Sequence, residues 1–144
     1  MKIDIEEIIR SLDAKANTIY YDDERITELI SKVREKIENN EIFADVLDDI
    51  RTSIEMIVDW KNGEYTSLSK NTVIIVIIGF LYLLDPLDIV PDFLKKGFLD
   101  DIIVIIYLLK RIKDELKLYK EWKKNQIISI ETPRIPDNIG IENS

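Results

Sequence analysis

Apolar residues recur along most of this chain at intervals of three and four positions, the spacing that gathers them on one buried face of an α-helix. The pattern predicts a short first helix over residues 5–12 and a connector over residues 11–21. Asp22 is a favourable N-cap for a second helix, which ends at the two asparagines 39 and 40. A third amphipathic helix follows and stops at Asn62-Gly63.

The segment from Val73 to Leu84 is apolar on all sides, which is typical of the central helix of a bundle. Its many Val and Ile residues would also suit a buried strand, but its length and its helical neighbours favour a helix. One of three hydroxyl residues is expected to cap it: Thr66, Ser67 or Ser69. A last long helix is predicted from Phe98 to Trp122, antiparallel to residues 72–84. The sequence therefore predicts an all-α, single-domain bundle of about five helices around an apolar hairpin that is joined by an acidic Pro/Gly turn.

The chain is expected to have three parts. Residues 1–66 carry 17 acidic and 9 basic side chains and form the acidic N-terminal part of the bundle. Residues 67–125 hold the helical hairpin, within a remainder of the chain that carries 11 side chains of each sign. Residues 126–144 contain two prolines and scattered isoleucines, which predicts an extended or poorly ordered tail. Five aromatic residues are expected in the core or at its edge: Trp60, Tyr65, Tyr107, Tyr119 and Trp122.

The 144 residues include neither cysteine nor histidine. This composition excludes disulfides and thiolate chemistry, and it removes the commonest general base and the commonest transition-metal ligand. A bound metal would be a hard cation held by oxygen atoms, such as Mg²⁺, Mn²⁺ or Ca²⁺. We therefore expect no cofactor other than such a cation, and the composition favours a non-enzymatic protein.

The net charge of −8 lies in the N-terminal part, which would repel the phosphates of a nucleic acid and attract a basic protein. The candidate partner-binding carboxylates are those of Asp22, Asp23, Asp45, Asp48 and Asp49. The first functional hypothesis is thus a non-enzymatic protein that binds a basic protein partner, as an inhibitor or a toxin-neutralising immunity protein does. The alternative interpretation is that the acidity only keeps a small protein soluble.

Five carboxylates stand in the turn between the apolar runs Val73–Leu84 and Ile102–Leu109. In a structural interpretation they cap helices and stabilise bends, with Asp85 as an N-cap and Gly97 at a chain reversal. In a functional interpretation, four of these carboxylates converge on a hard cation that serves a hydrolytic or regulatory role. The four are Asp88, Asp92, Asp100 and Asp101. Their spacing does not match a calcium-binding loop of the EF-hand type.

The same stretch resembles the signature of the bacterial YkvA-like family. Eight residues carry the resemblance: Tyr82, Pro86, Asp88, Pro91, Asp92, Gly97, Asp100 and Asp101. The chain departs from the signature at Asp85 and at Lys95-Lys96, where the family has a small residue and a proline-containing approach to the glycine. The resemblance covers residues 60–122. It implies a small helical domain of unknown function whose members are commonly membrane-associated, and it implies no reaction.

The longest uncharged run, Asn71–Leu84, has 14 residues and is shorter than the roughly 20 that span a bilayer. Residues 1–12 alternate charged residues with isoleucine and do not form a signal peptide. We therefore expect a cytoplasmic protein, with a membrane-peripheral helical hairpin as a further alternative. The lysines of residues 110–124 are interleaved with acidic residues, which indicates a solvated helix face rather than a surface for lipid or RNA.

Overall fold

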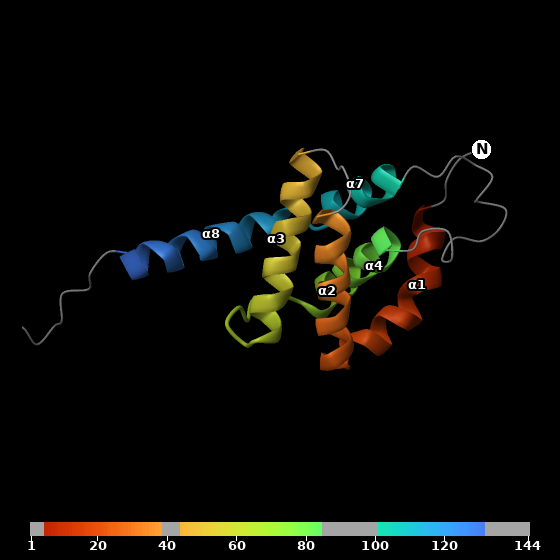
Figure 1. Ribbon diagram of the computed structural model, residues 1–144, viewed down its shortest axis with the longest axis horizontal. Helices are drawn as coiled ribbons and strands as arrows, with labels where there is room; N and C mark the ends of the chain where they lie inside the picture. Colours follow the sequence, from red (N-terminus) through yellow and green to blue (C-terminus); the bar gives the residue numbers. More distant parts are fainter. Residues whose placement is uncertain (1–4, 39–43, 85–100, 132–144) are drawn as a thin grey trace, which may run out of the picture.

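The computed structural model describes residues 5–38, 44–84 and 101–131. These three ranges form helices and contain no strand, which confirms the predicted all-α bundle. The helices are α1 (Ile5–Tyr20), α2 (Asp23–Glu38), α3 (Ala44–Lys61), α4 (Lys70–Leu84), α7 (Asp101–Arg111) and α8 (Lys113–Glu131). Figure 1 shows α2 and α3 upright, α1 at one side of the bundle, and α8 extending from the other side.

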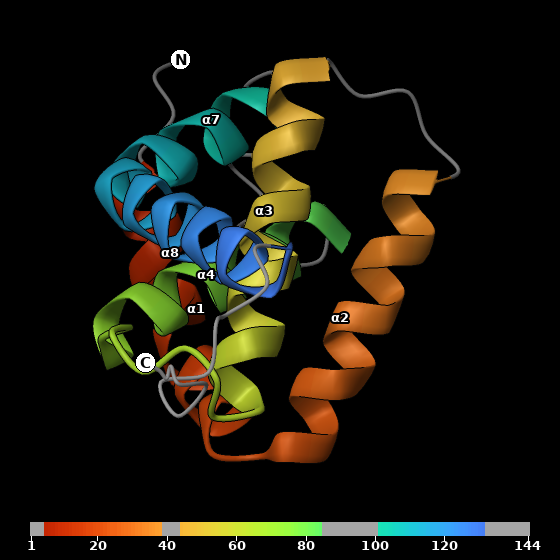
Figure 2. The same cartoon turned by 90° about the vertical axis from the view of Figure 1, so that its left-hand side faces the viewer.

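Helix α4 is the centre of the bundle. It packs against α1, α2 and α7, and the other helices enclose it in the views of Figure 1 and Figure 2. All but four of its 15 residues are buried, as its lack of a polar face requires. In Figure 1, α4 and α7 run in opposite directions, as the predicted hairpin does.

Local hydrogen bonds set where the helices begin and end. The Asp22 carboxylate accepts the Arg25 N–H at 3.2 Å, so Asp22 is the N-cap of α2 as predicted. Of the three candidate caps of α4, Ser69 is the one used, because its hydroxyl accepts the Thr72 N–H at 3.2 Å. Gly63 follows α3 with φ of 79°, the left-handed conformation that glycine adopts most readily.

The predicted connector over residues 11–21 is wrong, because α1 continues to Tyr20. Leu12, Ala16 and Ile19 are all buried and extend the apolar face that begins at Ile8. Ala16 is fully buried in this face, and its small side chain gave the pattern little hydrophobic weight. The first helix is therefore an ordinary long amphipathic helix.

The predicted last helix is two helices with a kink at Ile112. The Ile112 N–H bonds to the Leu109 carbonyl at 3.2 Å, three residues back, and α8 starts again at Lys113. Helix α8 continues to Glu131, so residues 126–131 are helical, where an extended or poorly ordered tail was predicted. Residues 132–144, the rest of the predicted tail, lie outside the described residues.

A cavity of about 30 Å³ lies where α3, α4 and α7 meet. Gly79 lines it from α4, and a Cβ atom added there would lie 3.6 Å from Leu108 Cδ1 of α7, an ordinary van der Waals distance. The glycine is thus not required by a close approach of the two helices. It leaves an unfilled space in the core and a flexible position inside a helix.

We predict that Gly79→Ala stabilises the protein by about 1 kcal/mol, because alanine favours the helix and the added methyl group fits the space. The matched control is Gly63→Ala, which should destabilise by about 1 kcal/mol because φ there is 79°. Urea denaturation of the two variants measures both effects. A loss of stability in Gly79→Ala would contradict the packing described for α4 and α7.

Candidate functional site

The acidic turn lies almost wholly outside the described residues. Asp88, Asp92 and Asp100 belong to the range 85–100, and Asp101 is the first residue of α7, with a side chain that is also not described. Among the side chains that the structure describes, no group of three or more carboxylates is placed to hold a metal ion. The cation site of the acidic turn stays a prediction.

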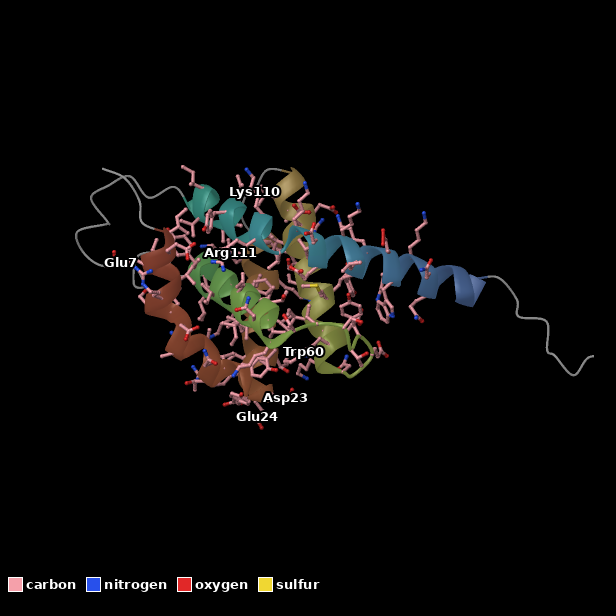
Figure 3. All side chains as sticks on the ribbon, turned by 180° about the vertical axis from the view of Figure 1, so that it is seen from behind. Glu7, Asp23, Glu24, Trp60, Lys110 and Arg111 are labelled. Atoms are coloured by element: carbon pink, nitrogen blue, oxygen red, sulfur yellow. The ribbon has the colours of Figure 1, made fainter. Side chains whose placement is uncertain are left out.

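The candidate partner-binding carboxylates do not form one patch. Asp22 and Asp23 lie where α2 begins, whereas Asp48 and Asp49 lie near the start of α3, and Figure 1 shows these helix ends at opposite ends of the bundle. Figure 3 shows Asp23 beside Glu24 at the α2 end. Asp45 is in the first turn of α3, and its side chain is not described.

Most of these carboxylates already have partners inside the chain. Asp22 caps α2, and Asp23 lies 3.3 Å from the ammonium group of Lys61. The Lys120 ammonium lies 3.7 Å from Asp48 and 3.8 Å from Asp49, so it ties α8 to α3. The predicted acidic surface is therefore partly neutralised by lysines of the same chain.

A wide groove of about 630 Å³ runs between the start of α3 and the kink that joins α7 to α8. We call it the lysine groove. Its floor is apolar and consists of Val46, Ile106, Leu109 and Leu116. Its rim carries four lysines, Lys110, Lys113, Lys117 and Lys120. Asp49 also lines the groove, next to Lys120.

The acidic residues interleaved with these lysines in the sequence lie beside or behind the lysine stripe and outside the groove. Successive residues of an α-helix are rotated by about 100°, so Lys113, Lys117 and Lys120 share one stripe, whereas Asp114 and Glu121 flank it at spacings of three and four residues from Lys117. None of the interleaved carboxylates lines the groove. The sequence interpretation as an evenly mixed, solvated face missed this separation.

Three of the four rim lysines are without an ion-pair partner among the described residues. Lys120 is held by Asp48 and Asp49, but Lys110, Lys113 and Lys117 make no such contact in that part of the chain. Figure 3 shows Lys110 leaving α7 on its outer side, and Arg111 pointing the other way. The rim therefore presents three lysines that no described side chain holds in an ion pair, although Asp114 and Glu121 lie within about one helical turn of Lys117.

A second polar cluster is buried between α3 and α8. The Tyr119 hydroxyl donates a hydrogen bond to Asp59 Oδ2 at 2.5 Å, and the Lys123 ammonium donates to the same oxygen at 3.2 Å. The rings of Tyr65 and Trp122 pack on the Tyr119 ring, with centroids 5.1 and 5.7 Å away. Burial, and then the hydrogen bond to Asp59, raises the pKa of Tyr119 far above its ordinary value. This cluster fastens α8 to the bundle.

A further polar contact joins α1 to α7. The Tyr107 hydroxyl donates to Glu6 Oε2, and Arg111 Nη1 lies 3.4 Å from the same oxygen. The hydrogen bond to Glu6 raises the pKa of Tyr107. Tyr107 and Arg111 are bound within the fold, so Arg111, unlike its neighbour Lys110, is not a free basic group.

The predicted aromatic core is confirmed in its described members. Tyr65 and Tyr119 are buried, and three are partly buried against the core: Trp60, Tyr107 and Trp122. Asp59 was missed as their polar partner, because a single carboxylate at the edge of an amphipathic helix is no different in sequence from a solvated one. The lysine groove was missed because it depends on the kink and on the packing of α3.

The fold and the groove define a small all-α bundle with a basic, apolar-floored surface. A protein of Bacillus subtilis (strain 168), named uncharacterized membrane protein YkvA, is 39% identical over 75 residues, which are 51% of this chain and 71% of that protein. This chain belongs to the YkvA-like family. No protein-family model matches the chain, and no solved structure is significantly similar to it.

We predict that Tyr119→Phe destabilises the protein by about 1–3 kcal/mol, because it removes a donor from a buried carboxylate. The matched control is Tyr21→Phe. Tyr21 is 72% exposed and its hydroxyl bonds only to the exposed Lys70, so its loss should change stability by less than about 0.5 kcal/mol. Equal effects in urea denaturation would show that the Asp59 cluster does not hold α8.

We also predict that stability falls as the pH rises through about 10. The pKa values of Tyr65, Tyr107 and Tyr119 are raised above 10.0 in the fold, so the unfolded chain loses these protons first and is favoured at alkaline pH. The stability that these three tyrosines contribute is fully present below the pKa that they have in the unfolded chain. Urea denaturation from about pH 8 to about pH 11 should show this fall, and Tyr119→Phe should make it shallower. An identical slope in the variant would contradict the prediction.

Proposed function

We propose that this protein is a non-enzymatic, membrane-peripheral protein that attaches to an anionic lipid surface through the lysine groove and the adjoining face of α8. The observation that supports this proposal is that three rim lysines of the groove, Lys110, Lys113 and Lys117, are held in no ion pair by the described side chains. A lysine close to an anionic membrane contributes about 1 kcal/mol to attachment. Several lysines on one stripe, together with apolar side chains beside them, are the usual ingredients of such a surface.

The charge of the whole chain is compatible with this orientation. Residues 1–66 hold the net charge of −8, whereas residues 103–126 carry seven basic and three acidic side chains. An anionic surface would repel the acidic part and attract the basic one. The protein would therefore bind with α7 and α8 towards the lipid and with α2, on the opposite side of the bundle in Figure 2, away from it.

Membrane attachment without a spanning helix also agrees with the comparison. The relative from Bacillus subtilis is named a membrane protein. Within the ranges that the structure describes, no helix is both long and apolar enough to cross a bilayer. Attachment to the membrane surface through the lysine groove would be one way for this chain to have the membrane location that the name of the relative states.

The hypothesis of a basic protein partner has weaker support. Its described carboxylates are divided between two ends of the bundle, and Asp23, Asp48 and Asp49 already pair with lysines of the chain. A partner would compete with Lys61 and Lys120 for these carboxylates, which is only a small rearrangement because Asp23 and Asp48 are largely exposed. The lysine groove needs no such rearrangement.

The proposal predicts that the double variant Lys113→Glu/Lys117→Glu binds vesicles containing phosphatidylglycerol at least about tenfold more weakly than the unaltered protein. The control is Lys32→Glu/Arg34→Glu, which changes the net charge equally on exposed positions of α2. It should bind nearly as well as the unaltered protein. Sedimentation with the vesicles measures the bound fraction, and added salt should reduce it.

Two results would contradict this proposal. One is equal binding to vesicles of phosphatidylcholine alone, which carry no net charge. The other is an equal loss of binding in the α2 control, which would mean that only the total charge of the protein matters.

A further inference from the structure

We infer that the lysine groove is a site for one anionic amphiphile, whose phosphate lies among the rim lysines while its acyl chain covers the apolar floor. This inference rests on the proposed membrane attachment and deepens it. Diffuse attraction to a charged surface needs only exposed lysines. The groove adds a concave apolar surface next to them, and that combination fits an individual lipid molecule.

A free phosphate or a protein carboxylate bound to the rim lysines would leave the apolar floor of the groove exposed to water. Ile106 and Leu109 of α7 are partly buried, and Val46 and Leu116 close the floor from α3 and α8. The groove volume of about 630 Å³ lies within the range of sites that hold small organic ligands. Covering apolar side chains with an acyl chain removes their surface from water, at about 25 cal/mol per Å².

The rim is arranged for a single negative group. Lys113 and Lys117 are four residues apart on α8, and Lys110 is three residues before Lys113. Like charges four residues apart on one helix, as Lys113 and Lys117 are, repel each other and weaken a free helix by about 0.2–0.5 kcal/mol. A phosphate between them replaces this repulsion with attraction. Asp49, the lining carboxylate, shares Lys120 with Asp48, so the lysine offsets one of their two negative charges and the other three rim lysines outnumber the one that remains.

The kink at Ile112 brings the two features together. It lets α7 supply Ile106, Leu109 and Lys110 while α8 supplies Lys113, Leu116 and Lys117, around the end of α3. The lysines and the apolar residues therefore belong to one hollow. This continuity favours an amphiphile over a purely ionic ligand.

The test uses monododecyl phosphate below its micelle-forming concentration, titrated into the full chain by calorimetry. We expect saturable binding of one molecule per chain. Lys113→Gln, at the rim, and Ile106→Gln, on the floor, should each weaken it at least about fivefold. Lys32→Gln on α2 is the matched control and should leave it unchanged. Inorganic phosphate and neutral dodecyl maltoside should each bind much more weakly, because the first lacks an alkyl chain and the second lacks a negative charge.

The outcomes separate the inference from the proposed function. Vesicle binding that depends on Lys113 and Lys117, without a saturable dodecyl phosphate complex, overturns the inference and leaves membrane attachment intact. Equal affinity for inorganic phosphate, or binding insensitive to both Lys113→Gln and Ile106→Gln, also overturns it. If the unaltered protein binds neither the vesicles nor dodecyl phosphate, both the inference and the proposed function are overturned. Thermal unfolding of each variant checks the fold, and the exposed Lys113→Gln decides the test should Ile106→Gln unfold.

Discussion

The rest of the structure depends on the need to bury α4 on every side. A helix with no polar face cannot lie on a surface, so each neighbouring helix must turn an apolar face towards it. Helices α1, α2 and α7 do so directly, and the small cavity beside Gly79 shows that α3 also reaches this centre. Once α4 is enclosed, the remaining helix, α8, has little of the core left to cover.

That limit explains the two roles of α8. Its inner turns are fastened to α3 by the buried Asp59 cluster, in which Tyr119 and Lys123 meet one carboxylate oxygen. Its outer face is free of the core and carries the lysine stripe. One helix thus serves stability on one side and presents charge on the other, and Lys123, which faces the core, is chemically separate from the lysines of the groove.

The sequence predicted the parts of the fold that follow from strong local patterns. The all-apolar α4, the cap at Asp22 and the stop at Gly63 each rest on a few adjacent residues and are confirmed. The length of α1 was missed because the small Ala16 weakens the hydrophobic pattern at one position of an otherwise regular apolar face. The kink at Ile112 was missed because it lies inside an unbroken helical pattern without glycine or proline.

The candidate site was less predictable, for a physical reason. The groove is lined by Val46 of α3 and by residues of α7 and α8 that are some 60 or more positions later. A local sequence pattern does not indicate which residues so far apart become neighbours in the fold. Charge composition pointed to the acidic N-terminal part, whose described carboxylates are largely occupied by Lys61 and Lys120. Which charges remain unneutralised is a property of the fold and not of the composition.

Helix α8 extends beyond the bundle in Figure 1, and this overhang has a consequence for its own persistence. From Trp122, the last ring of the buried cluster, to Glu131 it rises by roughly 14 Å at 1.5 Å per residue. A short helix without tertiary support is marginal in water. The outer turns are therefore expected to fray and re-form independently of global unfolding, and any surface that binds this part of the helix would lengthen the time it spends helical.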